Sequence, residues 1–129
     1  MRLFQIAPLE FEQFIKRVME RSGFVDVTVT RASGDGGIDV NAYVEEGNDF
    51  FAGTHVQAQV KRWRHAVGSH DINSFRGALS TTAKGVFVTT SAFTRAAVSE
   101  ASHANKPSIG LIDGPRLSAI VLRLNLTLQ

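Results

Sequence analysis

The stretches "IDVNAYV" (residues 38–44) and "VQAQVKR" (residues 56–62) decide the fold, because both alternate with a period of two. Up to Val44 and Lys61 the even-numbered positions are apolar and the odd-numbered positions carry polar groups, Tyr43 among them. Successive side chains of a strand point to opposite faces of a sheet. We therefore predict two strands, each with one dry face and one polar face.

The segment between them, "EEGNDFFAGT" (residues 45–54), is rich in turn-forming residues. A symmetric hairpin centred on Asp49 would set residue 39 opposite residue 59, because the two positions are equally far from the centre. Asp39, Gln59 and Lys61 would then share one patch of the sheet.

A polar strand face is most often the solvated side of an antiparallel sheet. The composition of this face argues for a site, because an acid and an amide oxygen can bind a hard cation, with a lysine beside them. Hydrolysis of a phosphoryl group uses such a set. Glu12 lies at the edge of the apolar stripe of the preceding helix and either joins this patch or is a solvated boundary residue.

The remaining pattern predicts an α/β domain with the order α-β-β-β-α-β-α-β-α. Apolar residues recur with helical spacing over 8–22, and Gly23 follows as a stop signal. A strand over 24–30 ends before "SGDGG", and an antiparallel meander follows. Right-handed crossovers then add parallel strands. The later elements are a helix over 72–79, a strand over 85–90, a helix over 94–105, a strand over 108–112 and a helix from Pro115.

Length and composition indicate one globular domain over residues 1–129, with 43% hydrophobic and 20% charged residues. The absence of cysteine excludes disulfides and thiolate metal sites. The first ten residues lack the apolar core of a signal peptide, and no apolar run is long enough to span a bilayer. We therefore expect a soluble cytoplasmic protein without membrane contacts.

The formal net charge of +2 is modest, but Lys61, Arg62 and Arg64 flank Trp63 in a cluster that suits contact with a polyanion. This signal is weak by itself, because many inert domains are slightly basic.

Three other motifs have simpler interpretations. "GDGGID" (residues 34–39) lacks the third glycine of a dinucleotide fingerprint and leads into a strand, so we expect no dinucleotide site there. Asp35 is most simply a turn residue, and a functional role for it is the alternative. His65 and His70 lack the partners of a zinc site. The hydroxyls of residues 89–91 end a strand before a helix, where they normally cap backbone N–H groups.

Taken in order, six stretches resemble the catalytic domain of Mrr-type restriction endonucleases, within the PD-(D/E)xK nuclease superfamily. They are "FEQFIKRVMERSGF", "GDGGIDV", "VQAQVKRW", "VGSHDINSFRGAL", "KGVFVTTSAFTRAA" and "IGLIDGPRL". The resemblance covers roughly residues 8 to 123. The joint occurrence of G-x-GGID and Q-x-K at this interval is far more specific than either motif alone.

The resemblance implies a restriction-endonuclease-like fold, a central mixed sheet flanked by helices. It also implies roles for four residues. Asp39 matches the metal-binding aspartate, and Gln59 stands where most of the superfamily has a carboxylate and Mrr-like members have glutamine. Lys61 matches the catalytic lysine, and Glu12 matches the acidic residue of the first helix. Many relatives also carry a winged-helix DNA-recognition domain for which this sequence has no room, so we expect a separate recognition partner.

We therefore expect a Mg²⁺-dependent DNA endonuclease in which Mn²⁺ can replace Mg²⁺. Asp39, the Gln59 oxygen and the Val60 carbonyl would hold the metal, while Lys61 and Glu12 act on the attacking water. Residues Lys61, Arg62, Trp63 and Arg64 would contact DNA.

Double-strand cutting by a domain with one site suggests a homodimer. Two alternatives stay open, an inactive nucleic-acid binding module and a structure-selective repair or junction nuclease. The joint presence of Asp39, Gln59 and Lys61 argues against the first.

Overall fold

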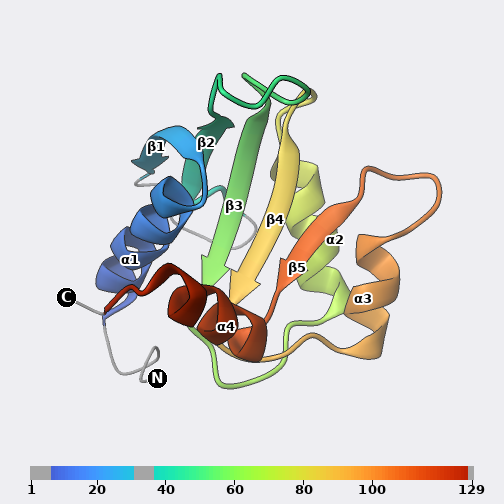
Figure 1. Cartoon of the computed structure of the whole chain (residues 1–129). Helices are drawn as coiled ribbons and strands as arrows, with labels where there is room; N and C mark the ends of the chain where they lie inside the picture. The colour runs from blue at the N-terminus through green and yellow to red at the C-terminus, as the bar shows by residue number, and fades with distance from the viewer. Residues whose placement is uncertain (1–6, 31–36, 128–129) are drawn as a thin grey trace.

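The computed structural model describes residues 7–30 and 37–127 of the chain (Figure 1). Its helices and strands follow the order predicted from the sequence, α-β-β-β-α-β-α-β-α. The elements are α1 (Pro8–Arg21), β1 (Phe24–Val29), β2 (Val40–Val44), β3 (His55–Lys61), α2 (Ser69–Ala78), β4 (Lys84–Thr89), α3 (Arg95–Ala101), β5 (Ile109–Ile112) and α4 (Gly114–Leu124).

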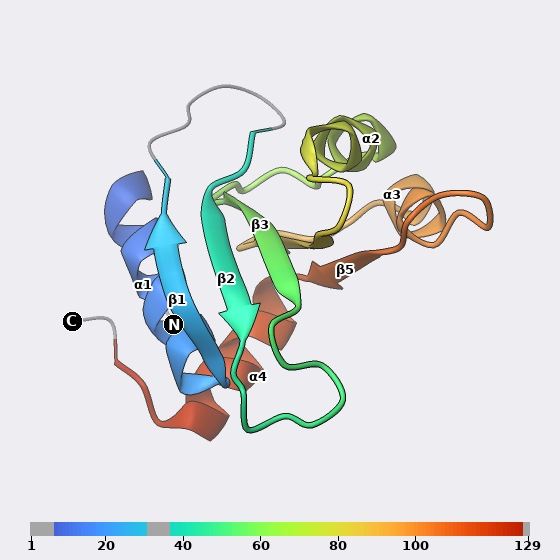
Figure 2. The same cartoon turned by 90° about the horizontal axis from the view of Figure 1, so that it is seen from above.

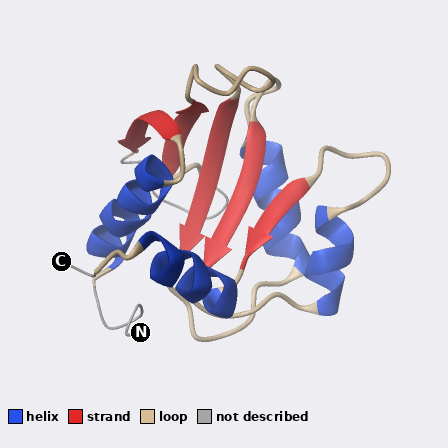
Figure 3. Cartoon of the chain, viewed as in Figure 1, coloured by secondary structure: helices blue, strands red, loops and turns tan. Residues whose placement is uncertain are grey.

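The five strands form one mixed sheet in the order β1-β2-β3-β4-β5. The pairs β1–β2 and β2–β3 are antiparallel, whereas β3, β4 and β5 run parallel (Figure 3). This is the predicted arrangement, a meander extended by parallel strands. The strands β3, β4 and β5 therefore end at the same edge of the sheet, which is also the edge where β2 begins.

The register of the β2–β3 hairpin is the one predicted from its symmetric spacing. Val40 pairs with Ala58, and Tyr43 pairs with His55. Each pair is equally far from Asp49, so the prediction of the register is confirmed.

Helices cover both faces of the sheet, α1 and α4 on one side and α2 and α3 on the other (Figure 2). The even positions of β2 and β3 pack under α1 and α4, as Val40 and Ala58 do. Phe87 of β4 packs with Ile72 and Phe75 of α2 on the opposite side. Each face thus has a core of its own.

The polar face of β3 is not solvated, because the layer of α2 and α3 covers it. Gln57 is 6% exposed and Gln59 is 2% exposed. Gln57 has a structural partner set, since its amide nitrogen donates to Asn41 and its oxygen accepts from the backbone N–H of Ser80. A buried glutamine needs such partners.

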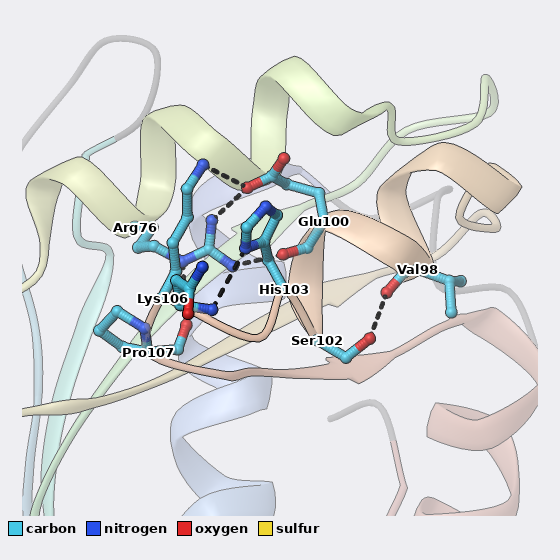
Figure 4. A network of polar contacts seen from close by, with 8 residues as sticks. Arg76, Val98, Glu100, Ser102, His103, Lys106 and Pro107 are labelled. Atoms are coloured by element: carbon cyan, nitrogen blue, oxygen red, sulfur yellow. Dashed lines mark hydrogen bonds and ion pairs between the residues drawn. The ribbon is translucent and has the colours of Figure 1, made fainter.

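Arg76 joins α2 to α3 (Figure 4). Its guanidinium pairs with the Glu100 carboxylate and donates to the backbone carbonyls of Glu100 and Pro107. Lys106 adds a second ion pair to the same carboxylate at 3.1 Å. These two cations lower the pKa of Glu100, Arg76 having the larger effect. The contacts fix α2 against α3 on the side of the sheet where these helices cover β4 and β5.

Several boundaries differ from those predicted. The strand predicted from residue 38 begins at Val40, and Ile38 packs with the α2–α3 core, so its predicted face is wrong. Helix α2 begins earlier, at Ser69, and α3 ends earlier, at Ala101. The strand β1 contains a register shift, and Asp26 within it has a left-handed φ of 51°. Short polar residues tolerate that conformation best, which permits a bulge there.

The turn assigned to Asp35 and most of the "SGDGG" break lie outside the described residues. Within residues 7–30 and 37–127, every helix is too short or too polar to cross a bilayer.

Candidate active site

The candidate site lies at the sheet edge where β3 ends and β2 begins. Lys61 is the last residue of β3, and Asp39 directly precedes β2. Glu12 belongs to the first turns of α1, which packs against β1, β2 and β3. Three segments distant in the sequence therefore meet here.

Backbone hydrogen bonds hold Asp39 from both sides. Its N–H donates to Ala58 at 2.9 Å, and its carbonyl accepts from the N–H of Thr30 at 2.8 Å. Its carboxylate oxygen Oδ2 accepts from the backbone N–H of Val60 at 2.7 Å. The side chain therefore takes the place of a backbone acceptor at the end of the β2–β3 ladder. Since the N–H and C=O of a strand residue point to the same side, the Val60 carbonyl faces the same gap.

Burial raises the pKa of the Asp39 carboxyl, and the Val60 N–H and the Lys61 ammonium only partly offset this effect. Burial also raises the pKa of Glu12, and the negative charge of Asp39 raises it further, while Lys61 lowers it. The structure thus brings Glu12, Asp39 and Lys61 within electrostatic reach of one another. A cation between the two carboxylates would favour their charged forms.

Gln59 lies on the same strand face as Lys61, and both line a pocket of about 240 Å³ between the sheet and α2. Its side chain is almost completely buried. The other residues that line the pocket are Trp63, His70, Asp71, Ser74 and Phe87. Gln59 thus lies beside Lys61 in this pocket, whereas the Asp39 carboxylate lies between β2 and β3, against the Val60 N–H.

His70, Asp71 and Ser74 are pocket residues that the sequence did not indicate. They belong to the first turns of α2, which the apolar pattern placed later in the chain. The sequence signal for the true start of α2 is Gly68 followed three residues later by Asp71. In the structure the Asp71 carboxylate accepts from the Gly68 N–H at 2.9 Å and so caps the helix. A start at Ser69 would have placed His70 and Ser74 one turn apart, on the same side of the helix.

The basic cluster of residues 61–64, at the end of β3, is hydrogen-bonded to the end of β4. The Thr89 hydroxyl donates to the Lys61 carbonyl at 2.9 Å, and the Thr90 hydroxyl donates to the Trp63 carbonyl at 2.7 Å. Both hydroxyls donate to backbone carbonyls, whereas the sequence led us to expect that they cap N–H groups. Thr89 does both, because its hydroxyl also accepts from the N–H of Ser91. Among the basic residues, Arg64 is exposed, and Lys61 and Arg62 are half-buried.

The donors at this edge are suited to a hard divalent cation. They are the carboxylates of Asp39 and Glu12 and the Val60 carbonyl, with the Gln59 side chain in the neighbouring pocket. The second oxygen of Asp39, Oδ1, makes no hydrogen bond to any described residue. Within the described part of the chain, no three acidic, histidine or cysteine residues cluster as a metal site. Such a sparse set fits Mg²⁺, which keeps several waters when bound to proteins.

Solved structures share this fold. The chain superposes on the DNA modification-dependent restriction endonuclease AspBHI with a TM-score of 0.73 and 21% identity, over 92% of this chain and 32% of that one. It superposes on the MspJI restriction endonuclease, solved in complex with a 27-mer oligonucleotide, with a TM-score of 0.67 and 28% identity. That match covers 89% of this chain and 28% of MspJI. The fold is therefore that of restriction endonucleases.

Sequence comparison gives the family. The profile of the Mrr catalytic domain, a restriction endonuclease family, matches residues 3–121. The type IV methyl-directed restriction enzyme EcoKMrr of Escherichia coli K12 is 32% identical over 126 residues. The match covers 93% of this chain and 40% of EcoKMrr, so the chain spans less than half the length of that relative. The chain belongs to the Mrr-type restriction endonuclease family.

Proposed function

We propose that this chain is a Mg²⁺-dependent endonuclease that hydrolyses phosphodiester bonds of DNA. The observation that carries the proposal is the contact between the Asp39 carboxylate and the Val60 N–H at 2.7 Å. This hydrogen bond holds a carboxylate, a group that binds hard cations, next to β3, the strand that carries Gln59 and Lys61. Family membership supports DNA as the substrate.

In this proposal, Asp39, the Gln59 side-chain oxygen and the Val60 carbonyl hold the cation, and Mn²⁺ can replace Mg²⁺. When bound, the metal supplies positive charge against the phosphate oxygens, where negative charge grows during hydrolysis. Asp39 contributes the only full negative charge of these three donors. The short contact with Val60 keeps that carboxylate from turning away.

Lys61 and Glu12 act on the attacking water. Lys61 offsets the charge of the scissile phosphate and orients the water, and it lies within electrostatic reach of both carboxylates. Glu12 lies near enough to Asp39 and Lys61 for both charges to act on its carboxylate. We assign Glu12 to orienting the water or holding a second cation.

The basic cluster of Lys61, Arg62, Trp63 and Arg64 lies at the same edge and is proposed to contact DNA beside the cut. Phosphate contacts of this kind position a protein on DNA without reading its sequence. The names of two relatives specify methyl-directed or modification-dependent cleavage. DNA with modified bases is therefore the first substrate class to examine.

We propose further that the chain works with other units. One site cuts one strand at a time, so double-strand cleavage calls for a homodimer. Because the chain spans 40% of its relative EcoKMrr, target recognition is assigned to a separate DNA-recognition partner or segment.

The experiment incubates purified protein with Mg²⁺, Mn²⁺ or EDTA on linear, supercoiled, methylated and branched DNA. We expect cleavage that requires the cation and is abolished by EDTA. Preference for branched DNA over linear DNA would support the junction-nuclease alternative. Binding without cleavage in every combination would support the binding module and contradict the proposal.

A further inference from the structure

Trp63 lies beside the proposed catalytic lysine. The Nζ atom of Lys61 is 5.4 Å from the centroid of the Trp63 ring, within the range of a cation–π contact. Resting on the proposed nuclease function, we propose that Trp63 is a positioning residue, which holds the Lys61 ammonium at the site through the face of its indole ring.

Lys61 needs such support because no ion pair with a described residue holds its ammonium in place. Among the described residues, its ammonium takes part in no ion pair and no hydrogen bond, and the Glu12 and Asp39 carboxylates act on it only at longer range. A lysine has a flexible four-carbon stem and loses considerable rotamer freedom when it is fixed. A neighbour that favours one rotamer therefore raises the fraction of time that the ammonium spends at the site.

Trp63 is itself held firmly. Its carbonyl accepts from the Thr90 hydroxyl at 2.7 Å, and its half-buried ring packs against the core beneath α2 and α3. The exposed His65 ring stacks on it with centroids 4.3 Å apart and an angle of 25°. The indole is thus enclosed by the core, the Lys61 side chain and His65.

The spacing in the sequence accounts for this contact. Residues two apart along an extended chain point to the same side, so K-x-W places the ring next to the lysine. Trp63 also belongs to the basic cluster that is proposed to contact DNA. The two roles differ in what they predict, because a DNA contact changes affinity whereas a positioning residue changes the rate of bound substrate.

The rate experiment compares Trp63→Leu, which keeps apolar volume without a π face, with Trp63→Phe, which keeps a smaller one. Single-turnover cleavage and DNA affinity are measured on the same preparations. We expect Trp63→Leu to slow cleavage of bound DNA about two- to thirtyfold, the range that a cation–π contact supplies, whereas the loss of a DNA contact alone would lower only the affinity. Trp63→Phe should recover most of the rate.

Two controls isolate the contact. Phe93→Leu removes another half-buried aromatic ring of the same core, which packs edge-on against Phe87 at 5.8 Å, and should leave the rate unchanged. In a Lys61→Ala background, Trp63→Leu should have no further effect, because an interaction with a missing partner cannot be lost twice.

An NMR measurement tests the contact without any cleavage. Protons above an aromatic face are shifted upfield, so the ε-methylene protons of Lys61 should be shifted upfield in the wild type and not in Trp63→Leu. An unshifted wild type, an affinity loss without a rate loss, or a full effect of Trp63→Leu on top of Lys61→Ala would overturn the positioning role. A wild type that cleaves no DNA but shows the shift would overturn the nuclease function, and catalytic positioning with it, while the contact itself stands.

Discussion

The carboxylate of Asp39 accepts a hydrogen bond of 2.7 Å from the backbone N–H of Val60. The same carboxylate has a raised pKa because it is buried, and it raises the pKa of Glu12 in turn. The Asp39 carboxylate is therefore held in a fixed position, but its charged form destabilises the folded protein when no cation is bound. Its geometry suits a metal site, and its energetics make that role measurable.

We predict that Asp39→Asn stabilises the metal-free protein at neutral pH. The folded state binds the Asp39 proton more tightly than the unfolded state, so the penalty appears as pH rises from the unfolded pKa and is complete above the folded pKa. The asparagine oxygen can still accept from Val60. Urea unfolding at pH 7 should show a gain on the order of 1 kcal/mol or less, since the side chain is only partly buried. The gain should vanish at acid pH; a loss at pH 7 would contradict the account.

A second prediction concerns the titration of Glu12. The Asp39 charge raises its pKa and the Lys61 charge lowers it, so two variants should have opposite effects. NMR titration of the carboxyl carbons should show a lower Glu12 pKa in Asp39→Asn and a higher one in Lys61→Met. A Glu12 that titrates identically in all three proteins would mean that the groups do not share one site.

A third prediction concerns Gln59, which offers the cation no charge. Wild-type protein should bind Mg²⁺ weakly without DNA, because one carboxylate and neutral oxygens are a poor set for a cation that dehydrates reluctantly. Gln59→Glu should bind Mg²⁺ more tightly in calorimetry and keep some cleavage. Because Gln59 is 2% exposed, the variant should lose about 1–3 kcal/mol of stability in EDTA and regain part of it with Mg²⁺. Tight Mg²⁺ binding by DNA-free wild type would refute this.

Gly114 should be needed for the close approach of α4 to the end of β4. A Cβ atom there would stand 2.3 Å from the Thr90 carbonyl oxygen, a backbone atom that cannot swing aside. Gly114→Ala should therefore cost about 1–3 kcal/mol in denaturant unfolding. At Gly110 the nearest atom would be a Val86 methyl at 3.5 Å, so Gly110→Ala is a matched control and should be close to neutral. Equal stabilities of the two variants would contradict the packing argument.

The sequence predicted the hairpin register because alternation and equal spacing are local properties of one segment. It did not predict that Ile38 changes face, since this depends on where the regular pairing of β2 begins, at Val40, and side-chain alternation does not mark that point. The contact from Val60 to Asp39 is likewise invisible in a pattern of side-chain polarity, because its donor is a backbone group.

The pocket beside Lys61 was only half predicted, for a related reason. Gln59 and Lys61 follow from strand alternation, whereas His70 and Ser74 come from a helix whose first turn is polar. Apolar periodicity locates the buried part of a helix and misses a polar first turn. The capping pair of Gly68 and Asp71 was the sequence signal for that turn.

The central claim is that Asp39 and Lys61 form the catalytic centre, and single-turnover cleavage beside a gel-shift titration tests it most directly. Wild type, Asp39→Asn and Lys61→Ala are assayed with Mg²⁺ on the DNA that the wild type cuts. We predict that both variants lose orders of magnitude in rate, because charge stabilisation supplies several kcal/mol. DNA binding should persist, slightly weaker in Lys61→Ala and unchanged or stronger in metal-free Asp39→Asn. Cleavage that continues unchanged in Asp39→Asn would contradict the account.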